Sequence, residues 1–473
     1  MLRSATTSKM PLHRRTPPFL KLIHASPFHT SAALKRPVAQ TTTTAIHRKS
    51  LENQSEAPTS PQCLHRLPTS NLLRNLILGA WFSSPYLFQP GLSVMRTIAN
   101  SKSVFLNPDA NPLLGAAVKL FIYNHFCAGT NKREIDRTKA EIKRIGFEGI
   151  VLCYGRETGV GEIDGSKAGS QEQLKAEVGR WREGNLETLD MMDEGDWMGI
   201  KLTGAGPQVT KSLMRDEEPP AAWVDAMDRI CEKAKARGCR IWIDSEQQVV
   251  QDGIDRWTVD LMSKYNVNGS VLVYNTLQAY LKSSRFKLNA QLAAAKQGGW
   301  TLAIKLVRGA YIDSDPRERI HDTKEDTDAS YNGIVHDLLS GTNLDLPPEK
   351  LPKVELFLAG HNPASVGAAI DLMQTLSAAG KLKVKPTFAQ LQGMADELGC
   401  SILQRADGLR ENGAAMVPRV YKCLTWGSVQ ECMQYLLRRA VENSGGTARM
   451  KDGYAAYMGE LRRRTAAVVR FRV

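Results

Sequence analysis

Short apolar runs recur along the chain from residue 149 onward, and helical patterns separate them. The runs are Gly149–Tyr154, Gly199–Thr203, Arg240–Asp244, Ser270–Tyr274, Leu302–Val307, Val354–Ala359, Val384–Phe388 and Ala414–Val417. The clearest intervening helical patterns are Ala221–Arg237, Leu277–Gln297, Pro363–Ala379 and Val429–Asn443. Apolar strands that alternate with helices predict a parallel sheet covered by helices. Eight such units predict a (β/α)₈ barrel of the α/β class.

An open, doubly wound sheet is the alternative architecture. Its usual G-x-G-x-x-G fingerprint is missing after the first run, where the loop reads GRETGVGEIDG. The seventh run is the weakest of the eight because Pro386 interrupts it. The stretch Asp313–Lys353 is long for a barrel connection, so we expect an enlarged loop with one helix around Asp328–Leu339.

Helical periodicity also precedes the barrel, from Leu72 to Ile145. The most hydrophobic part, Leu73–Met95, is interrupted by Arg74, Pro85 and Pro90, and is therefore a poor membrane span. We expect one or two helices there that pack on the domain and contact a membrane surface. The predicted organisation is a transit peptide and disordered linker (1–67), an N-terminal helical region (68–148), the barrel (149–445) and a basic helical tail (446–473).

Charge is distributed very unevenly along the chain. The net charge is +13, but residues 1–108 hold thirteen Lys and Arg and two acidic residues, so the remaining chain carries only +2. Residues 1–51 are basic, free of Asp and Glu, and rich in Ser and Thr, which is typical of a mitochondrial transit peptide. The near-neutral remainder, without an aromatic-interleaved basic groove, argues against nucleic acid as a partner.

The eight cysteines include no C-x-x-C pair, which favours reduced core cysteines over a disulfide framework or a zinc site. A (β/α)₈ barrel has its active site at the carboxyl ends of its strands. The candidates for a site are therefore the polar residues near the end of each run or shortly after it. They are Tyr154, Arg156, Glu157, Lys201, Asp244, Glu246, Gln278, Tyr280, Lys305, Arg308, His361, Asn362, Gln390 and Tyr421. This set suits an anionic ligand and a large polar cofactor. Metal catalysis is disfavoured because His361 is the only strand-end histidine.

A second candidate is the helical segment YLLRRAVEN, in which Tyr435, Arg438, Arg439 and Glu442 share one stripe at i, i+3, i+4 and i+7. Two adjacent guanidinium groups can clamp a carboxylate. An exposed, ion-paired helix face would give the same spacing, so the pattern leaves both interpretations open.

Two long motifs, KLVRGAYID (305–313) and YLLRRAVENSG (435–445), resemble those of the proline dehydrogenase family, eukaryotic mitochondrial branch. Five short segments support the resemblance in the same order: IKLT, IDSEQ, YNTLQAYL, GHN and QLQGMAD. The resemblance covers about residues 70–450 and implies a barrel that holds FAD non-covalently. It also implies that L-proline is oxidised to Δ1-pyrroline-5-carboxylate and that electrons pass to a quinone of the mitochondrial inner membrane, on its matrix side.

The resemblance further implies roles for individual residues. Asp244 and Lys305 would be catalytic. The proline pocket would be formed by Lys201, Tyr421, Tyr435, Arg438 and Arg439. The flavin contacts would be Ser245, Gln278, Lys305, Arg308, Gly309, Ala310, His361 and Glu442. The sequence departs from the family pattern at Lys305, where many bacterial members have Arg, and at Gly360, where Thr or Ser is usual.

Three alternatives stay open from the sequence. The first is a hydroxyproline dehydrogenase. Family members that prefer hydroxyproline tend to lose the tyrosine that corresponds to Tyr421, and its presence here favours proline. A catalytically silent barrel that senses a carboxylate ligand would lack bound flavin. A metal-dependent barrel hydrolase would contain a bound metal.

Removal of residues 1–50 should abolish import into mitochondria, because this segment is predicted to be the targeting signal. Catalytic activity in vitro should stay intact, because the predicted barrel begins only at residue 149. The test compares the activity and import of the full chain with those of the shortened chain. Loss of activity in the shortened chain would instead make the segment structural.

Overall fold

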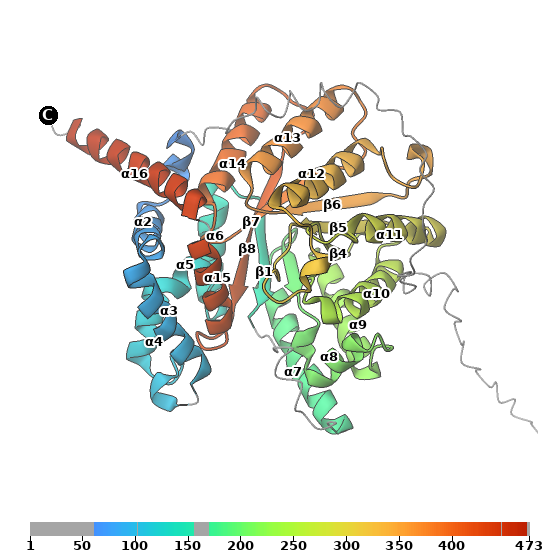
Figure 1. Cartoon of the computed structure of the whole chain (residues 1–473), viewed down its shortest axis with the longest axis horizontal. Helices are drawn as coiled ribbons and strands as arrows, with labels where there is room; N and C mark the ends of the chain where they lie inside the picture. Colours follow the sequence, from blue (N-terminus) through green and yellow to red (C-terminus); the bar gives the residue numbers. More distant parts are fainter. Residues whose placement is uncertain (1–60, 102, 156–169, 446, 471–473) are drawn as a thin grey trace, which may run out of the picture. The chain divides into compact units, whose positions relative to one another are not determined.

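Eight parallel strands close into one barrel in the order β1 to β8, and β8 pairs with β1 (Figure 1). The computed structural model describes residues 61–101, 103–155, 170–445 and 447–470. The strands are β1 (Gly149–Tyr154), β2 (Trp197–Ile200), β3 (Arg240–Ile243), β4 (Val273–Gln278), β5 (Leu302–Val307), β6 (Val354–Ala359), β7 (Pro386–Leu391) and β8 (Arg419–Trp426). The predicted transit peptide and two loop candidates, Arg156 and Glu157, lie outside the described residues.

Helices surround the strands (Figure 1). The main ones from β1 onward are α7 (Gln171–Asp190), α8 (Pro207–Met214), α9 (Ala221–Ala236), α10 (Gln248–Tyr265), α11 (Ser284–Gly298), α12 (Lys324–Ser340), α13 (Pro363–Ala378), α14 (Asp396–Glu411), α15 (Met433–Gly445) and α16 (Thr447–Arg470). Local sequence signals set several helix ends. Ser170 and Gln173 form a capping box at the start of α7, and Thr323 and Asp326 form another at the start of α12.

The predicted (β/α)₈ barrel is confirmed, and three of its strands lie at the predicted residues: β1, β5 and β6. The last predicted strand, Ala414–Val417, is wrong, because β8 begins only at Arg419. Two charged residues, Arg419 and Lys422, interrupt the apolar pattern of the true strand and hid it. This shift of the last strand changes which end of the barrel its side chains reach.

Aromatic side chains fill the half of the barrel interior that lies nearer the beginnings of the strands. The rings of Trp197, Trp242, Tyr274, Phe357 and Tyr421 contact one another with centroid separations from 4.6 to 6.3 Å. All five are fully or almost fully buried. Four of the six ring pairs are packed edge-on and two are tilted, and we call this layer the aromatic floor.

Gly199 makes room for that floor. A Cβ atom at this position would lie 2.5 Å from both Trp242 Nε1 and Cys153 Sγ, closer than any side chain tolerates. Because Gly199 has no side chain, the indole of Trp242 on the next strand can enter the barrel.

The chain before the barrel folds into helices. They are η2 (Pro61–Arg66), α2 (Thr69–Ser83), α3 (Pro85–Asn100), η3 (Val104–Leu106), α4 (Pro112–Val118), the π-helical turn η4 (Lys119–Tyr123), α5 (Asn124–Phe126) and α6 (Lys132–Ile145). The segment expected to form one or two helices forms two, and Pro85 occupies the first turn of the second. Among residues 61–101, 103–155, 170–445 and 447–470, no helix is long and apolar enough to cross a bilayer.

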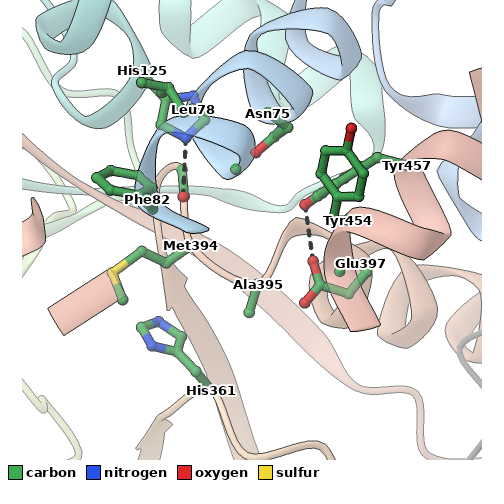
Figure 2. Close-up of a pocket in the computed structure, with 13 residues that line it drawn as sticks. Asn75, Leu78, Phe82, His125, His361, Met394, Ala395, Glu397, Tyr454 and Tyr457 are labelled. Atoms are coloured by element: carbon green, nitrogen blue, oxygen red, sulfur yellow. Dashed lines mark hydrogen bonds between the residues drawn. The ribbon is translucent and has the colours of Figure 1, made fainter. Parts of the chain in front are cut away.

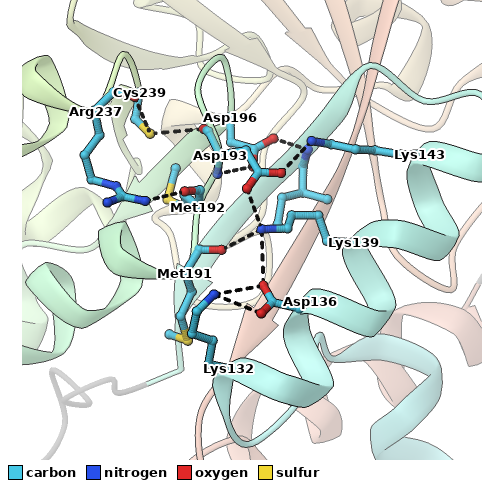
Figure 3. A network of polar contacts seen from close by, with 11 residues as sticks. Lys132, Asp136, Lys139, Lys143, Met191, Met192, Asp193, Asp196, Arg237 and Cys239 are labelled. Atoms are coloured by element: carbon cyan, nitrogen blue, oxygen red, sulfur yellow. Dashed lines mark hydrogen bonds and ion pairs between the residues drawn. The ribbon is translucent and has the colours of Figure 1, made fainter.

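Charged contacts fasten α6 near the strand beginnings (Figure 3). The buried Lys139 ammonium lies 2.8 Å from Asp193 Oδ1 and donates to the Met191 carbonyl at 3.0 Å. Asp196 continues the network, because its carboxylate accepts hydrogen bonds from the backbone N–H groups of Ile150 and Asp193. These contacts join α6 to the turn that leads into β2 and to the first residues of β1.

Helix α16, the basic C-terminal segment, packs across the start of the described chain. Arg464 donates to the Leu64 and Leu67 carbonyls at 3.1 and 2.7 Å, and its Nε lies 2.7 Å from the fully buried Glu460 carboxylate. A cation on the last carbonyls of a short helix is stabilising. This helix therefore closes the helical region over η2 and α2.

A buried ion pair outside the barrel joins β8 to α14. Lys422 Nζ lies 2.5 Å from Asp396 Oδ1, and both side chains are almost completely buried. Burial acts to raise the pKa of Asp396, but the Lys422 ammonium and the Asn75 amide outweigh it and lower that pKa. The pair holds a charged strand residue within an apolar layer.

Replacement of Lys422 by Met should destabilise the protein by about 3–5 kcal/mol, because the buried Asp396 carboxylate would lose its counter-charge. Urea unfolding of the parent and the variant measures the loss. The double variant Lys422→Met/Asp396→Asn, which removes both charges, should be more stable than the single variant. A single variant within 1 kcal/mol of the parent would contradict the assignment.

Candidate active site

An ion pair stands on the aromatic floor at the centre of the barrel. Lys305, from β5, lies with its Nζ 2.5 Å from Asp244 Oδ1 and 3.9 Å from the centroid of the Trp242 ring. Lys305 is 8 % exposed. The carboxylate and the indole face both attract the ammonium group in a largely dry setting. The structure thus brings together the two residues expected to be catalytic.

A chain of hydrogen bonds links the loops that follow β3, β4 and β5. Gln278 accepts from the Ala310 N–H at 3.3 Å and donates to the Glu246 carbonyl at 3.5 Å. The Glu246 carboxylate in turn accepts from the Thr203 N–H at 3.2 Å and from its hydroxyl group. Ser245, another predicted flavin contact, lies buried in the same loop. Glu246 was a strand-end candidate without an assigned role, and it locks the β2 and β3 loops together.

Arg308, a predicted flavin contact, is anchored by two helices. Its guanidinium pairs with Asp328 of α12, donates to Ser365 Oγ of α13 at 2.6 Å and lies 5.1 Å from the Tyr331 ring centroid. These contacts fix the direction of the side chain.

Gly309, the next predicted contact, has a positive φ of 153°, and a Cβ there would lie 2.4 Å from the Tyr280 ring. The structural requirement for glycine at this position is the close approach of that ring.

His361, which follows β6, accepts a hydrogen bond at Nε2 from the Leu391 N–H at 3.0 Å. It also lines a pocket between α2, the loop after β7 and α16 (Figure 2). On the other side of this pocket the buried His125 Nε2 lies 3.0 Å from the Gly393 carbonyl. Burial lowers the pKa of His125 to about 4, so its imidazole is neutral at pH 7.

The predicted stripe on α15 is partly buried, which decides against a fully exposed, ion-paired face. Tyr435 and Arg439 are 7 % and 8 % exposed. The Arg439 guanidinium lies 5.2 Å from the Tyr435 ring centroid, and its Nη2 lies 2.6 Å from Glu442 Oε1. Arg438, by contrast, is half-buried. The ion pair at i, i+3 orders the guanidinium of Arg439.

Two thiols face each other across the neighbouring strands β1 and β8. Cys153 of β1 and Cys423 of β8 have their sulfur atoms 3.9 Å apart. The hydrogen bond to Cys423 and burial raise the pKa of Cys153.

Tyr421 is the one predicted pocket residue that the structure places elsewhere. It pairs with Gly149 at the beginning of β1, packs in the aromatic floor, and accepts from Arg419 Nη2 at 2.7 Å. The prediction failed because the eighth strand was set too early, which put Tyr421 after the strand instead of near its start. The preference for proline inferred from Tyr421 therefore loses its basis.

The β8 residue that replaces Tyr421 near the rim is Cys423, two residues farther along. Alternation along a strand would have found it, had the strand been located correctly. Lys201 follows β2 on the rim side, where its carbonyl accepts from Trp181 Nε1 at 3.2 Å. In the described part of the chain, no group of three or more His, Cys, Asp or Glu residues could hold a metal ion.

Comparisons with known proteins agree with this fold and assign a family. The proline dehydrogenase family model matches residues 155–452. A probable mitochondrial proline dehydrogenase of Schizosaccharomyces pombe is 28% identical over 397 residues, which cover 72% of this chain and 79% of that protein. A hydroxyproline dehydrogenase of Bos taurus is 26% identical over 397 residues, with 74% and 82% covered.

A solved structure of proline utilization A (PutA) from Bdellovibrio bacteriovorus shares the fold, with a TM-score of 0.60 and 16% identity. The match covers 87% of this chain and 42% of PutA. The match to mitochondrial proline dehydrogenase 1 of Caenorhabditis elegans likewise covers only 42% of that protein. The family model spans well over half of the chain. The chain therefore belongs to the proline dehydrogenase family.

Proposed function

We propose that this protein is an FAD-dependent proline dehydrogenase that oxidises L-proline to Δ1-pyrroline-5-carboxylate and passes the electrons to a membrane quinone. The observation that carries the proposal is the buried Lys305–Asp244 pair on Trp242, with a second buried cation, Arg439, presented by α15. A small zwitterion with a carboxylate fits such a site, since fixed guanidinium donors bind carboxylates strongly.

The chemistry of the rim fits a flavin. Lys305 and Arg308 supply positive charge, Gln278 supplies an amide, and His361 supplies an imidazole with its tautomer set by the Leu391 N–H. The residues proposed to hold FAD are Ser245, Gln278, Lys305, Arg308, Gly309, Ala310, His361 and Glu442. Bound FAD would supply the hydride acceptor, a chemistry that protein side chains lack.

The protein's own contribution is position and charge. Arg438, Arg439 and Lys201 are proposed to bind the proline carboxylate and so hold the ring in one orientation. Glu442 orders Arg439 through their 2.6 Å contact. Asp244 fixes the Lys305 ammonium. Tyr435, whose hydroxyl finds no hydrogen-bond partner among the described residues, is proposed as an apolar wall of the pocket.

Hydroxyproline is a second candidate substrate. The pocket wall that Tyr421 was expected to provide is absent from the rim, and the smaller Cys423 and Cys153 lie there instead. One of the relatives that cover most of the chain is named a hydroxyproline dehydrogenase. A small thiol leaves more room for a substituted ring than a tyrosine would.

The proposed location is the matrix side of the mitochondrial inner membrane. Several relatives are named mitochondrial, and residues 1–51 of this chain are basic and acid-free. A quinone acceptor is lipid-soluble, so the proposal includes peripheral contact with that membrane.

The decisive test is the absorbance spectrum of the purified protein, without residues 1–50, before and after anaerobic addition of L-proline or hydroxyproline. Flavin bands that bleach with proline, and less with hydroxyproline, are expected. Stronger bleaching with hydroxyproline would favour the second candidate. Protein that stays colourless when FAD is supplied would overturn the flavoenzyme proposal and favour a ligand sensor.

Replacement of Arg439 by Met should raise the KM for proline about 100-fold while flavin stays bound, because a buried charge-assisted pair contributes about 3 kcal/mol. Steady-state kinetics and the flavin absorbance of the same preparation measure both properties. Arg419→Met is the matched control, since Arg419 contacts Glu148 and Tyr421 at the other end of the barrel. An unchanged KM in Arg439→Met would refute the carboxylate clamp.

A further inference from the structure

The helices that precede the barrel expose an unusual number of large apolar side chains. We call this set the apolar surface. Its members, with their exposed fractions, are Leu73 44%, Ile77 61%, Tyr86 91%, Leu87 59%, Val94 58%, Val104 69%, Phe105 83%, Leu106 38%, Leu113 84%, Leu120 75% and Phe121 43%. Large apolar side chains that are exposed together on neighbouring helices mark a site of interaction.

The exposure follows the helical period, so it is not a scatter of single residues. Across α4 and the π-helical turn η4, positions 113, 116, 117 and 120 are all exposed and read Leu, Ala, Ala, Leu. On α2 the exposed positions 73, 77 and 80 read Leu, Ile, Ala. An ordinary surface helix places polar residues at such positions. At these positions of α2, α4 and η4 the outward residues are apolar instead.

Other apolar residues of these helices are buried against α15. Trp81 and Phe82 of α2 and Phe88 and Leu92 of α3 are buried in the cluster that includes Leu436 of α15. Figure 1 shows α2, α3 and α4, in blue and cyan, gathered on one side of the barrel next to α15. The apolar surface is therefore additional to the core.

The charges of this region point to an anionic partner. Between residues 61 and 121 the sequence contains one acidic residue, Asp109, against the basic Arg66, Arg74, Arg96, Lys102 and Lys119. The Asp109 carboxylate accepts hydrogen bonds from the backbone N–H groups of Val429 and Gln430, at 3.0 and 3.4 Å. Its charge is thus engaged at the connection to α15. Arg66 pairs with Asp407 and Lys119 with Glu134, whereas Arg96 is exposed on α3. An apolar surface with basic and few acidic residues suits a bilayer with anionic headgroups.

We infer that the apolar surface of α2, α3, η3, α4 and η4 inserts into the interface of an anionic lipid membrane. This identifies the surface for the membrane contact included in the proposed function and rests on that proposal for its biological purpose. It also orients the protein: α3 packs against α15, the helix that carries Tyr435 and Arg439. The docked membrane would then lie on the same side of the barrel as the proposed substrate clamp.

The test measures the binding of the full chain to phosphatidylcholine vesicles with and without cardiolipin, by co-sedimentation. The variant Phe105→Ser/Leu113→Ser/Leu120→Ser should lower the partition coefficient about 100-fold or more, since each buried Leu or Phe contributes roughly tenfold. A matched control, Val224→Ser/Val249→Ser/Phe286→Ser, removes exposed apolar residues of α9, α10 and α11 and should bind like the parent. Thermal unfolding reports folding without any need for catalytic activity, so failure of the proposed function would leave this test intact.

Retained binding in the first variant would overturn the inference, because another segment, such as residues 1–60, would then carry the contact. Equal loss in both variants would overturn it as well. Sedimentation velocity without vesicles tests a second copy of the chain as the occupant. A parent dimer that the first variant makes monomeric would assign the surface to self-association and refute membrane docking.

A gentler pair of variants tests the same point without removing apolar area. Phe105→Trp and Phe286→Trp each add one indole at an exposed phenylalanine. With vesicles of brominated lipid, the fluorescence of the indole added at 105 should be quenched and that at 286 should not. Quenching at neither position, or equally at both, would contradict the inference.

Discussion

Closure of the parallel sheet is the constraint on which the rest of this structure depends. The pairing of β8 with β1, from Gly149–Tyr421 to Tyr154–Trp426, brings the carboxyl ends of all eight strands to one rim. Residues far apart in the chain then meet. Asp244 and Lys305, separated by 61 residues, form a 2.5 Å ion pair only because β3 and β5 belong to one closed barrel.

The aromatic floor gives that ion pair its character. Trp242 contributes to the floor and also lies beneath the Lys305 ammonium. Side chains that exclude water strengthen the attraction between Lys305 and Asp244 and raise the cost of breaking it. The same reasoning applies outside the barrel to Lys422 and Asp396. In both places a charge from a strand is tolerated in an apolar layer because a partner is supplied by another element.

The sequence predicted much of this, and its failures have physical reasons. Strands buried on both faces, such as Leu302–Val307, gave continuous apolar runs and were located correctly. β8 was missed because Lys422, paired outside the barrel, interrupts its pattern. Because of that one error, Tyr421 was predicted at the rim, whereas it lies in the aromatic floor. The roles of Trp242, Cys153 and Cys423 had no local signal, since a buried apolar or thiol side chain looks the same in a core and beside a site.

The sequence by itself determined the eightfold alternation, the candidate residues at the strand ends, the stripe on α15 and the family, because these depend on local periodicity and on motifs. Only the tertiary structure decided which residues meet. It paired Arg439 with Glu442, placed Tyr421 near Gly149, set Cys153 against Cys423 and left an apolar face uncovered on α2 to η4. Those outcomes depend on strand register and on which helix face packs inward, and neither is encoded in a local stretch of the chain.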